Sequence, residues 1–379
     1  MKKIILFILL VAILVSGNCV NQAEKASKDN EKQATESKPK GMRIFYASHS
    51  LMWDMPPVLT EAAEAYGIEG HTVLGIQRLG VSRTSQHWNL PDNKNQAKQA
   101  LKAGNVDAFV MSPIGMPDPG IDNFVKLGLE HNPNAKFYIQ VSWPGMGLLD
   151  NNDMESMMGG IRGGGTRGGR GGNTNIPPAN TPTNEPGAMA PSSRNVTLSY
   201  AGFGGGFGGG AGGRGGMMGG GMFGGGMMGG GQNYNITPEE IAKINVKNNK
   251  SAEDQAKKIN EEVGKTVVFL VPSAQAHNAL RTMIYNKEMP GMTDQGEVFR
   301  DFIGHPTDPV IALNAYLHFS VMYGVSPVGL PVPSILKKSS KPEYREEKFN
   351  LALQELAWKI VSNYPPTGVK APEEEKKND

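Results

Sequence analysis

Cysteine is almost absent from this chain of 379 residues, which contains only Cys19. A single cysteine cannot form an internal disulfide, and it excludes a cluster of thiolates around a metal ion. An excess of charge is also lacking, because 38 Lys and Arg residues nearly balance 36 Asp and Glu residues and leave a formal net charge of +2. So small a net charge does not indicate a nucleic-acid partner or a charged membrane surface.

Long apolar runs are missing except at the N-terminus. There a basic start, Met1-Lys2-Lys3, precedes an apolar run over 4–15 and then small residues before Cys19. This layout predicts a secretory signal over 1–19, too short to remain as a membrane span. The position of Cys19 resembles a bacterial lipoprotein processing site, at which the cysteine becomes the lipidated N-terminus.

Ordinary signal cleavage near Gly17 or Asn18 is the alternative, with Cys19 incidental. Either reading predicts export, to the cell envelope through a lipid anchor in the membrane or else by secretion. Residues 20–40 are almost entirely polar and are expected to form a solvated tether.

Short β-rich runs alternate with helical stretches over 41–153. A fully apolar run of strand length lies at 44–47, further β-rich runs lie at 72–76, 106–111 and 136–141, and helix formers dominate 57–66, 93–104 and 122–130. Strands and helices that alternate at this spacing predict βαβ units and a parallel sheet covered by helices on both faces.

Glycine interrupts this pattern over 154–232, which holds 30 of the 49 glycines. The stretch has too little bulky apolar surface to offset its ordering entropy, so a disordered insertion is expected. Its Arg-Gly-Gly units are similar to those of RNA-binding tails, but an exported protein rarely meets RNA. No nucleic-acid partner is therefore predicted, and an adhesive or assembly role remains an alternative for this segment.

Regular structure resumes over 233–365, before a charged tail at 366–379. Thr237-Pro238-Glu239-Glu240 forms a capping box, which predicts a helix towards Gly264 with a break near Asn248-Asn249. A strand at 266–271 and helices at 274–285, 309–323 and 345–363 follow. The same alternation on both sides of the insertion predicts one α/β domain that is interrupted rather than two domains.

Ser50 follows the first predicted strand, within Ser48-His49-Ser50. Ligands bind outside the carboxyl ends of the strands of an open parallel sheet, so Ser50 is a candidate nucleophile. A serine in this position is also a common helix cap or turn residue. Gly80 follows the second strand, where glycine allows a backbone N–H to approach a developing oxyanion closely, although a turn glycine is the alternative.

His305 lies in Gly304-His305-Pro306, shortly before a predicted helix. A histidine with a near-neutral pKa can deprotonate a serine and later protonate the leaving group, and Asp301 is in position to orient it. A loop histidine with local hydrogen bonds is the alternative. His318 lies inside a predicted helix and indicates packing, and the remaining histidines show no spacing typical of a metal site.

Together these residues resemble the SGNH/GDSL hydrolase family, and within it the SGNH-like exported proteins common in planctomycete-type bacteria. The segments that carry the resemblance are ASHSLM (47–52), QRLGVSRTSQHWNLPD (77–92), VDAFVMSPIGMPDPGIDNF (106–124), VPSAQA (271–276) and YLHFSVMYGVSPVGLP (316–331). The resemblance implies a three-layer α/β/α fold with a flavodoxin-like parallel sheet. It covers about 43–150 and 237–363.

Matched to the family, Ser50 is the nucleophile, Gly80 the second oxyanion donor after the Ser50 N–H, and His305 the base. Three positions depart from the family pattern. Ser48 stands in place of a glycine, Met111-Ser112-Pro113 stands where an asparagine is expected, and Phe302 occupies the position of the aspartate, one residue after Asp301. A one-residue bulge helped by Gly304 restores Asp301 to the site. Gln86 and Asn89 are alternative amide donors to the oxyanion.

The resemblance implies an exported serine esterase that needs no cofactor or metal. Its expected substrates are small-molecule or glycan esters, including carbohydrate O-acetyl esters. The departures leave open a catalytically degenerate surface lipoprotein of the same fold that binds a glycan or a protein partner.

Overall fold

The computed structural model describes residues 38–144, 235–301 and 303–370. Five strands form one parallel sheet in the order β2-β1-β3-β4-β5: β1 (Arg43–Ser48), β2 (Thr72–Arg78), β3 (Ala108–Ser112), β4 (Lys136–Gln140) and β5 (Val268–Val271). The predicted α/β class with a parallel sheet is confirmed, and this order is compatible with a flavodoxin-like fold.

The sheet includes strands from both sides of 145–234. β4 pairs directly with β5, with Phe137 opposite Val268 and Ile139 opposite Leu270. The Gly-rich segment, the signal with Cys19, most of the tether and the end of the charged tail lie outside the described residues.

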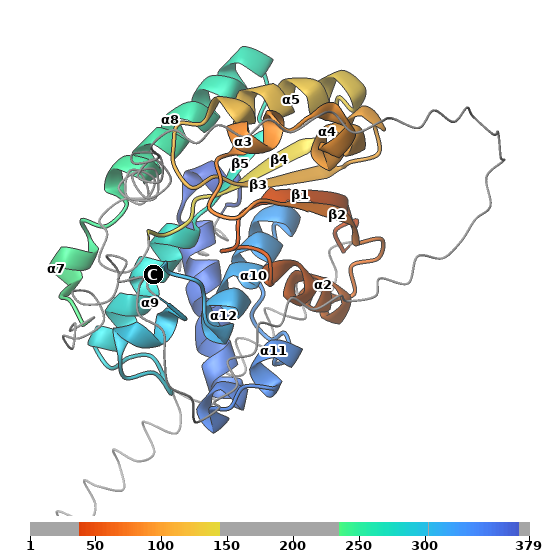
Figure 1. The fold of residues 1–379 in the computed structure, drawn as a ribbon. Helices are drawn as coiled ribbons and strands as arrows, with labels where there is room; N and C mark the ends of the chain where they lie inside the picture. Colours follow the sequence, from red (N-terminus) through yellow and green to blue (C-terminus); the bar gives the residue numbers. More distant parts are fainter. Residues whose placement is uncertain (1–37, 145–234, 302, 371–379) are drawn as a thin grey trace, which may run out of the picture. The chain divides into compact units, whose positions relative to one another are not determined.

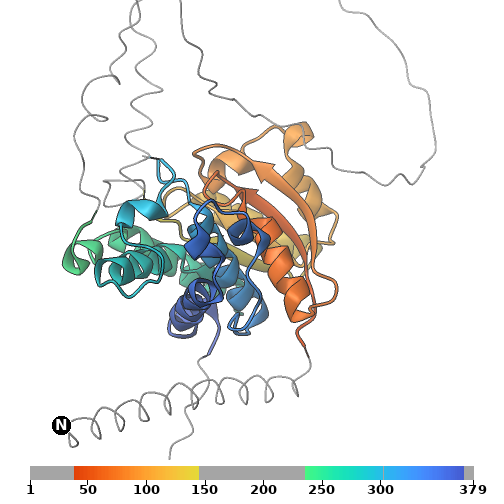
Figure 2. The same ribbon diagram turned by 90° about the horizontal axis from the view of Figure 1, so that it is seen from below.

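Helices cover both faces of the sheet (Figure 1). One face carries α3 (Thr84–Trp88), α4 (Gln96–Lys102), α5 (Pro119–His131) and α8 (Val246–Val263). The other carries α2 (Met55–Tyr66), α9 (Ser273–Tyr285), α10 (Asp308–Tyr323) and α12 (Glu347–Ser362). Seen from below, the C-terminal helices, coloured blue, lie over this second face (Figure 2).

Burial on both faces explains the continuous apolar runs that marked the strands. All five residues of β3 are buried, and Phe109 stacks on Phe45 and contacts the rings of Phe124 and Phe137. Helix α10 is buried over almost its whole surface. His318 within it bonds through Nδ1 to the Asn314 carbonyl, as expected for a packing histidine.

Two helix predictions differ from the structure. The break expected near Asn248-Asn249 lies earlier, between α7 (Pro238–Ile241) and α8, where Asn245 adopts a left-handed φ of 64°. The single helix expected over 93–104 is a 3-10 turn, η1 (Asp92–Lys94), followed by α4. Asn95 separates them because its side chain accepts a hydrogen bond from the Lys98 N–H and so begins a new helix.

Short elements complete the fold: η2 (Gln295–Val298), α11 (Ser334–Lys337), η3 (Pro342–Arg345) and η4 (Pro365–Thr367). Among the residues described, no helix has both the length and the apolar character needed to cross a membrane.

Candidate active site

The turn after β1 separates two serines with different surroundings. Ser48 ends the strand, and its Oγ is buried without a hydrogen-bond partner among the described residues. Ser50 lies two residues later, beyond the end of the strand, and is only partly buried. Ser50 is therefore the serine presented at the carboxyl edge of the sheet.

Ser50, His305 and Asp301 form a continuous chain of hydrogen bonds. His305 Nε2 lies 2.7 Å from Ser50 Oγ, and His305 Nδ1 lies 2.6 Å from Asp301 Oδ2. With the proton on Nδ1, the imidazole donates to the carboxylate and accepts the Ser50 hydroxyl proton through Nε2. This is the arrangement in which a histidine can act as a base towards a serine.

Asp301 also accepts two backbone hydrogen bonds through Oδ1, from the N–H groups of Ile303 and His305. Partial burial raises the pKa of this carboxyl, but the hydrogen bonds from the His305 ring and backbone outweigh it and leave the pKa below its usual value. Asp301 is therefore ionised at neutral pH and able to hold the His305 ring in one tautomer.

The loop that carries His305 is closed by its own backbone. Phe299 forms an isolated bridge with Pro306, and the Arg300 N–H donates to the His305 carbonyl at 2.7 Å. Gly304 has a φ of 94°, which a residue with a side chain rarely adopts. This backbone lets the carboxylate four residues before the histidine reach the ring, as the bulge hypothesis requires.

Trp143 holds this loop through a hydrogen bond to its backbone. Its indole Nε1 donates to the Gly304 carbonyl at 2.8 Å, and its side chain is completely buried. The ring stacks on His277, with 4° between the planes and 5.0 Å between the centroids. Burial lowers the pKa of His277 well below its usual value, so this histidine is a neutral packing partner.

His49 fixes the turn that contains Ser50. Its Nδ1 accepts from the Leu51 N–H at 3.3 Å, and its Nε2 lies 3.0 Å from Ser112 Oγ at the end of β3. Burial, followed by repulsion from His87, lowers the pKa of His49 to about 3, so the ring stays neutral. Ser112 thus bonds to the turn that contains Ser50.

The backbone N–H groups of Ser50 and Gly80 both lack an acceptor among the described residues. The β1–β2 ladder ends at the Leu79 N–H, which donates to the Ser48 carbonyl at 3.2 Å. Gln86 lies on α3, where its Oε1 accepts from the Arg83 N–H, and Asn89 follows the helix as its C-terminal cap.

Charged side chains beside the His305 loop are paired with one another. Arg300 lies 3.5 Å from Asp54, four residues after Ser50, and both side chains are about half exposed. Burial raises the pKa of nearby Asp308, although Arg300 opposes the shift. No group of three or more potential metal ligands occurs in the described part of the chain.

Comparisons with known proteins give little beyond this geometry. No family model and no curated protein matches the chain. The crystal structure of a DUF4886 family protein from Bacteroides uniformis is similar at 12% identity, with a TM-score of 0.43 over 86% of this chain and 96% of that one.

Three supporting residues were not predicted from the sequence: Trp143, His49 in its role as turn anchor, and Asp118. The partner of Trp143, the Gly304 carbonyl, lies far along the chain, and the contacts of His49 depend on the geometry of its turn. Local sequence patterns therefore give no signal for these two residues. Asp118 followed by Pro119 is a sequence typical of a helix start, and the structure places the N-terminus of α5 there. This pattern would have moved the predicted start at 122 to its observed position.

Proposed function

We propose that the protein is an SGNH/GDSL-type serine hydrolase that cleaves ester bonds. The single observation that carries the proposal is the hydrogen-bonded chain from Ser50 through His305 to Asp301. The position of Ser50 after β1 and of Gly80 after β2, at one edge of a parallel sheet, also supports it. The family resemblance in the sequence adds to these observations.

In the first half of the reaction, Ser50 Oγ attacks the ester carbonyl carbon while His305 Nε2 takes the hydroxyl proton. Asp301 stabilises the imidazolium that forms. The negative charge on the carbonyl oxygen is held by the N–H groups of Ser50 and Gly80. The carbon–oxygen bond to the alcohol then breaks, and His305 gives its proton to the departing alcohol, which leaves an acyl ester on Ser50.

In the second half, a water molecule takes the place of the alcohol. His305 accepts a proton from the water as its oxygen attacks the acyl carbon, and the same two N–H groups hold the oxyanion. Collapse of this intermediate releases the acid, and His305 returns the proton to Ser50 Oγ. Every proton moves through residues of the chain.

The proposed substrates are small-molecule or glycan esters, including carbohydrate O-acetyl esters. The proposed location is the cell envelope, with Cys19 lipidated and anchored in the membrane, or secretion if the signal is simply removed. Substrate class and location both rest on the sequence.

The alternative is a catalytically degenerate surface protein that binds a glycan or a partner. Two departures from the family pattern favour it: the missing asparagine at Met111-Ser112-Pro113 and the shifted aspartate. The 2.6 Å contact between Asp301 and His305 removes the second of these arguments. We therefore favour the hydrolase.

Hydrolysis of p-nitrophenyl acetate and of acetylated xylan by the purified protein tests the proposal. The expected result is release of p-nitrophenolate and acetate that disappears in Ser50→Ala. Equal release by the wild type and Ser50→Ala would contradict the proposed function, and failure with xylan alone would contradict only the glycan substrate.

Trp143→Phe is expected to lower kcat about tenfold with little change in KM. Phenylalanine keeps the stacking on His277 but cannot donate to the Gly304 carbonyl, so the His305 loop is held less firmly, and small displacements of a catalytic group reduce rates strongly. Steady-state kinetics with p-nitrophenyl acetate measure both constants. Trp358→Phe on α12 is the matched control, and an equal loss of kcat there would count against a positioning role for Trp143.

A further inference from the structure

The segment from Leu79 to Arg83, which we name the oxyanion loop, joins β2 to α3 and is fixed at both ends. At its start the Leu79 N–H donates to the Ser48 carbonyl, and Ser82 Oγ donates to the Leu79 carbonyl at 3.0 Å. At its end the Ile114 N–H donates to the Ser82 carbonyl at 3.1 Å. Gly80 and Val81 form the tip between these anchors.

Val81 adopts a φ of 42°, in the left-handed region. This conformation is unusual for any residue with a side chain and is most unfavourable for a β-branched one. Such strain persists only where the surrounding contacts impose it, and it is concentrated at functional sites. The contacts that hold the oxyanion loop must therefore be strong enough to keep Val81 strained.

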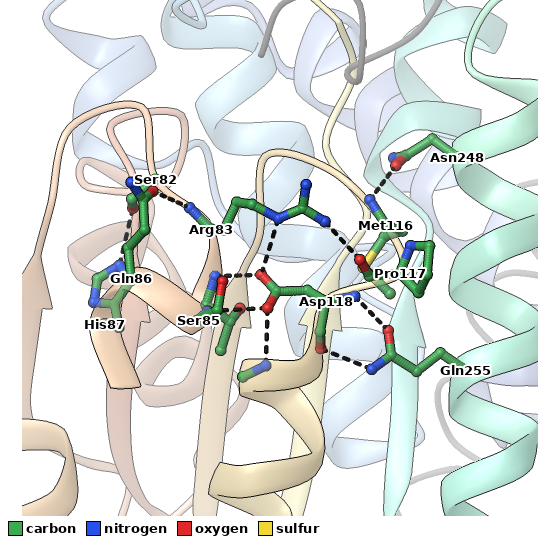
Figure 3. Close-up of polar contacts among 12 residues, drawn as sticks. Ser82, Arg83, Ser85, Gln86, His87, Met116, Pro117, Asp118, Asn248 and Gln255 are labelled. Carbon is green, nitrogen blue, oxygen red and sulfur yellow. Dashed lines mark hydrogen bonds and ion pairs between the residues drawn. The ribbon is translucent and has the colours of Figure 1, made fainter. Parts of the chain in front are cut away.

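Asp118 lies beside the end of the oxyanion loop, where α3 begins (Figure 3). Its side chain has no exposed surface, and its carboxylate accepts from the N–H groups of Thr84 at 2.5 Å, Ser85 at 3.0 Å and Gly120 at 2.9 Å. Arg83 Nε lies 3.9 Å away. One carboxylate thus caps α3, directly after the oxyanion loop, and α5 as well.

The backbone of Asp118 is fixed in turn to α8. Gln255 Oε1 accepts from the Asp118 N–H at 2.9 Å, and Gln255 Nε2 donates to the Asp118 carbonyl at 2.7 Å (Figure 3). Arg83 Nη2 donates to the neighbouring Pro117 carbonyl at 2.5 Å. The carboxylate is therefore rigidly placed, and the beginning of α3 is held to it.

We propose that Asp118 is a positioning residue for catalysis, which holds the oxyanion loop so that the Gly80 N–H stays directed at the reacting carbonyl. This inference rests on the proposed hydrolase function and deepens it. Donors that are fixed before the reaction need no reorganisation as the oxyanion forms, which is why their placement affects the rate of the chemical step.

Asp118→Asn tests the proposal, because an amide nitrogen would oppose at least one of the three N–H donors. We expect kcat for p-nitrophenyl acetate to fall about 10- to 100-fold, while KM and the shape of the pH profile stay unchanged. Asp107→Asn is the matched control, since Asp107 also accepts three hydrogen bonds, from Arg43, but lies at the opposite edge of the sheet. It should lower Tm without changing kcat at temperatures well below Tm.

Substitutions of Val81 give a second test that does not depend on the stability of Asp118→Asn. Asparagine tolerates the left-handed conformation, so Val81→Asn is expected to raise Tm by about 2 °C and to lower kcat less than Val81→Gly does. Val81→Gly also relieves the strain but frees the tip of the loop, and we expect it to lower kcat at least about fivefold.

The outcomes separate the inference from the proposed function. Hydrolysis that depends on Ser50, together with full kcat in Asp118→Asn, would overturn the positioning role alone, whatever the activity of Val81→Gly. Equal losses of kcat in Asp118→Asn and Asp107→Asn would do the same. A wild type without Ser50-dependent hydrolysis would overturn both.

Discussion

Ser50→Ala is expected to lower kcat for p-nitrophenyl acetate by about 10⁴- to 10⁶-fold, the range found when a serine nucleophile is removed from such a site. Alanine has no oxygen at the position 2.7 Å from His305 Nε2, so no covalent intermediate can form. The residue is only partly buried in a turn, and Tm should stay within about 2 °C of the wild type. Steady-state kinetics and thermal unfolding measure the two effects.

Ser48→Ala is the matched control for this change. The Ser48 hydroxyl is buried without a partner among the described residues, and its removal should leave kcat unchanged and increase the free energy of unfolding by up to about 1 kcal/mol. A larger loss of activity in Ser48→Ala than in Ser50→Ala would mean that Ser48, and not Ser50, is the nucleophile.

Asp301→Asn is expected to lower kcat by about 10³- to 10⁴-fold at neutral pH. The amide nitrogen of asparagine favours a ring with its proton on Nε2, and a protonated Nε2 cannot accept the proton of Ser50. KM should change little, because Asp301 acts through His305. Asp294→Asn, which removes an exposed carboxylate that caps η2, is the control and should retain kcat.

The pH dependence of stability follows from the same carboxylate. The pKa of Asp301 is lower in the folded protein, so its ionised form stabilises the fold at neutral pH. This contribution should be lost as the pH falls below the usual carboxyl range and through the lowered pKa. Urea unfolding of the wild type and Asp301→Asn should therefore differ at neutral pH and converge in acid. A difference in the free energy of unfolding that grows as the pH falls would contradict a lowered pKa of Asp301.

The sheet was predictable from the sequence because every strand except β2 is largely buried and has an apolar centre. Helix boundaries were harder, since they depend on single side chains. Asn95 begins α4 by accepting from Lys98, and the left-handed Asn245 precedes α8. Both asparagines lie in stretches rich in polar residues, so the local sequence does not mark them as helix boundaries.

Ser50 and His305 were predicted as candidates because each has a recognisable place, one after the first strand and one before a late helix. The contact of Asp301 with the His305 ring does not follow from the sequence alone, since it depends on the backbone at Gly304. Trp143 had no signal at all, because its partner is the Gly304 carbonyl, 161 residues away. Local sequence patterns therefore identify candidate catalytic residues, whereas the contacts that position them depend on packing between distant parts of the chain.

The most direct measurement is labelling of the purified protein with a fluorophosphonate, followed by mapping of the modified residue. The probe reacts with a serine that an adjacent base has activated. We predict one phosphonate adduct per chain, on Ser50, and its loss in a His305→Ala variant. A protein that stays unlabelled, or that is labelled on another residue, would contradict the proposed site.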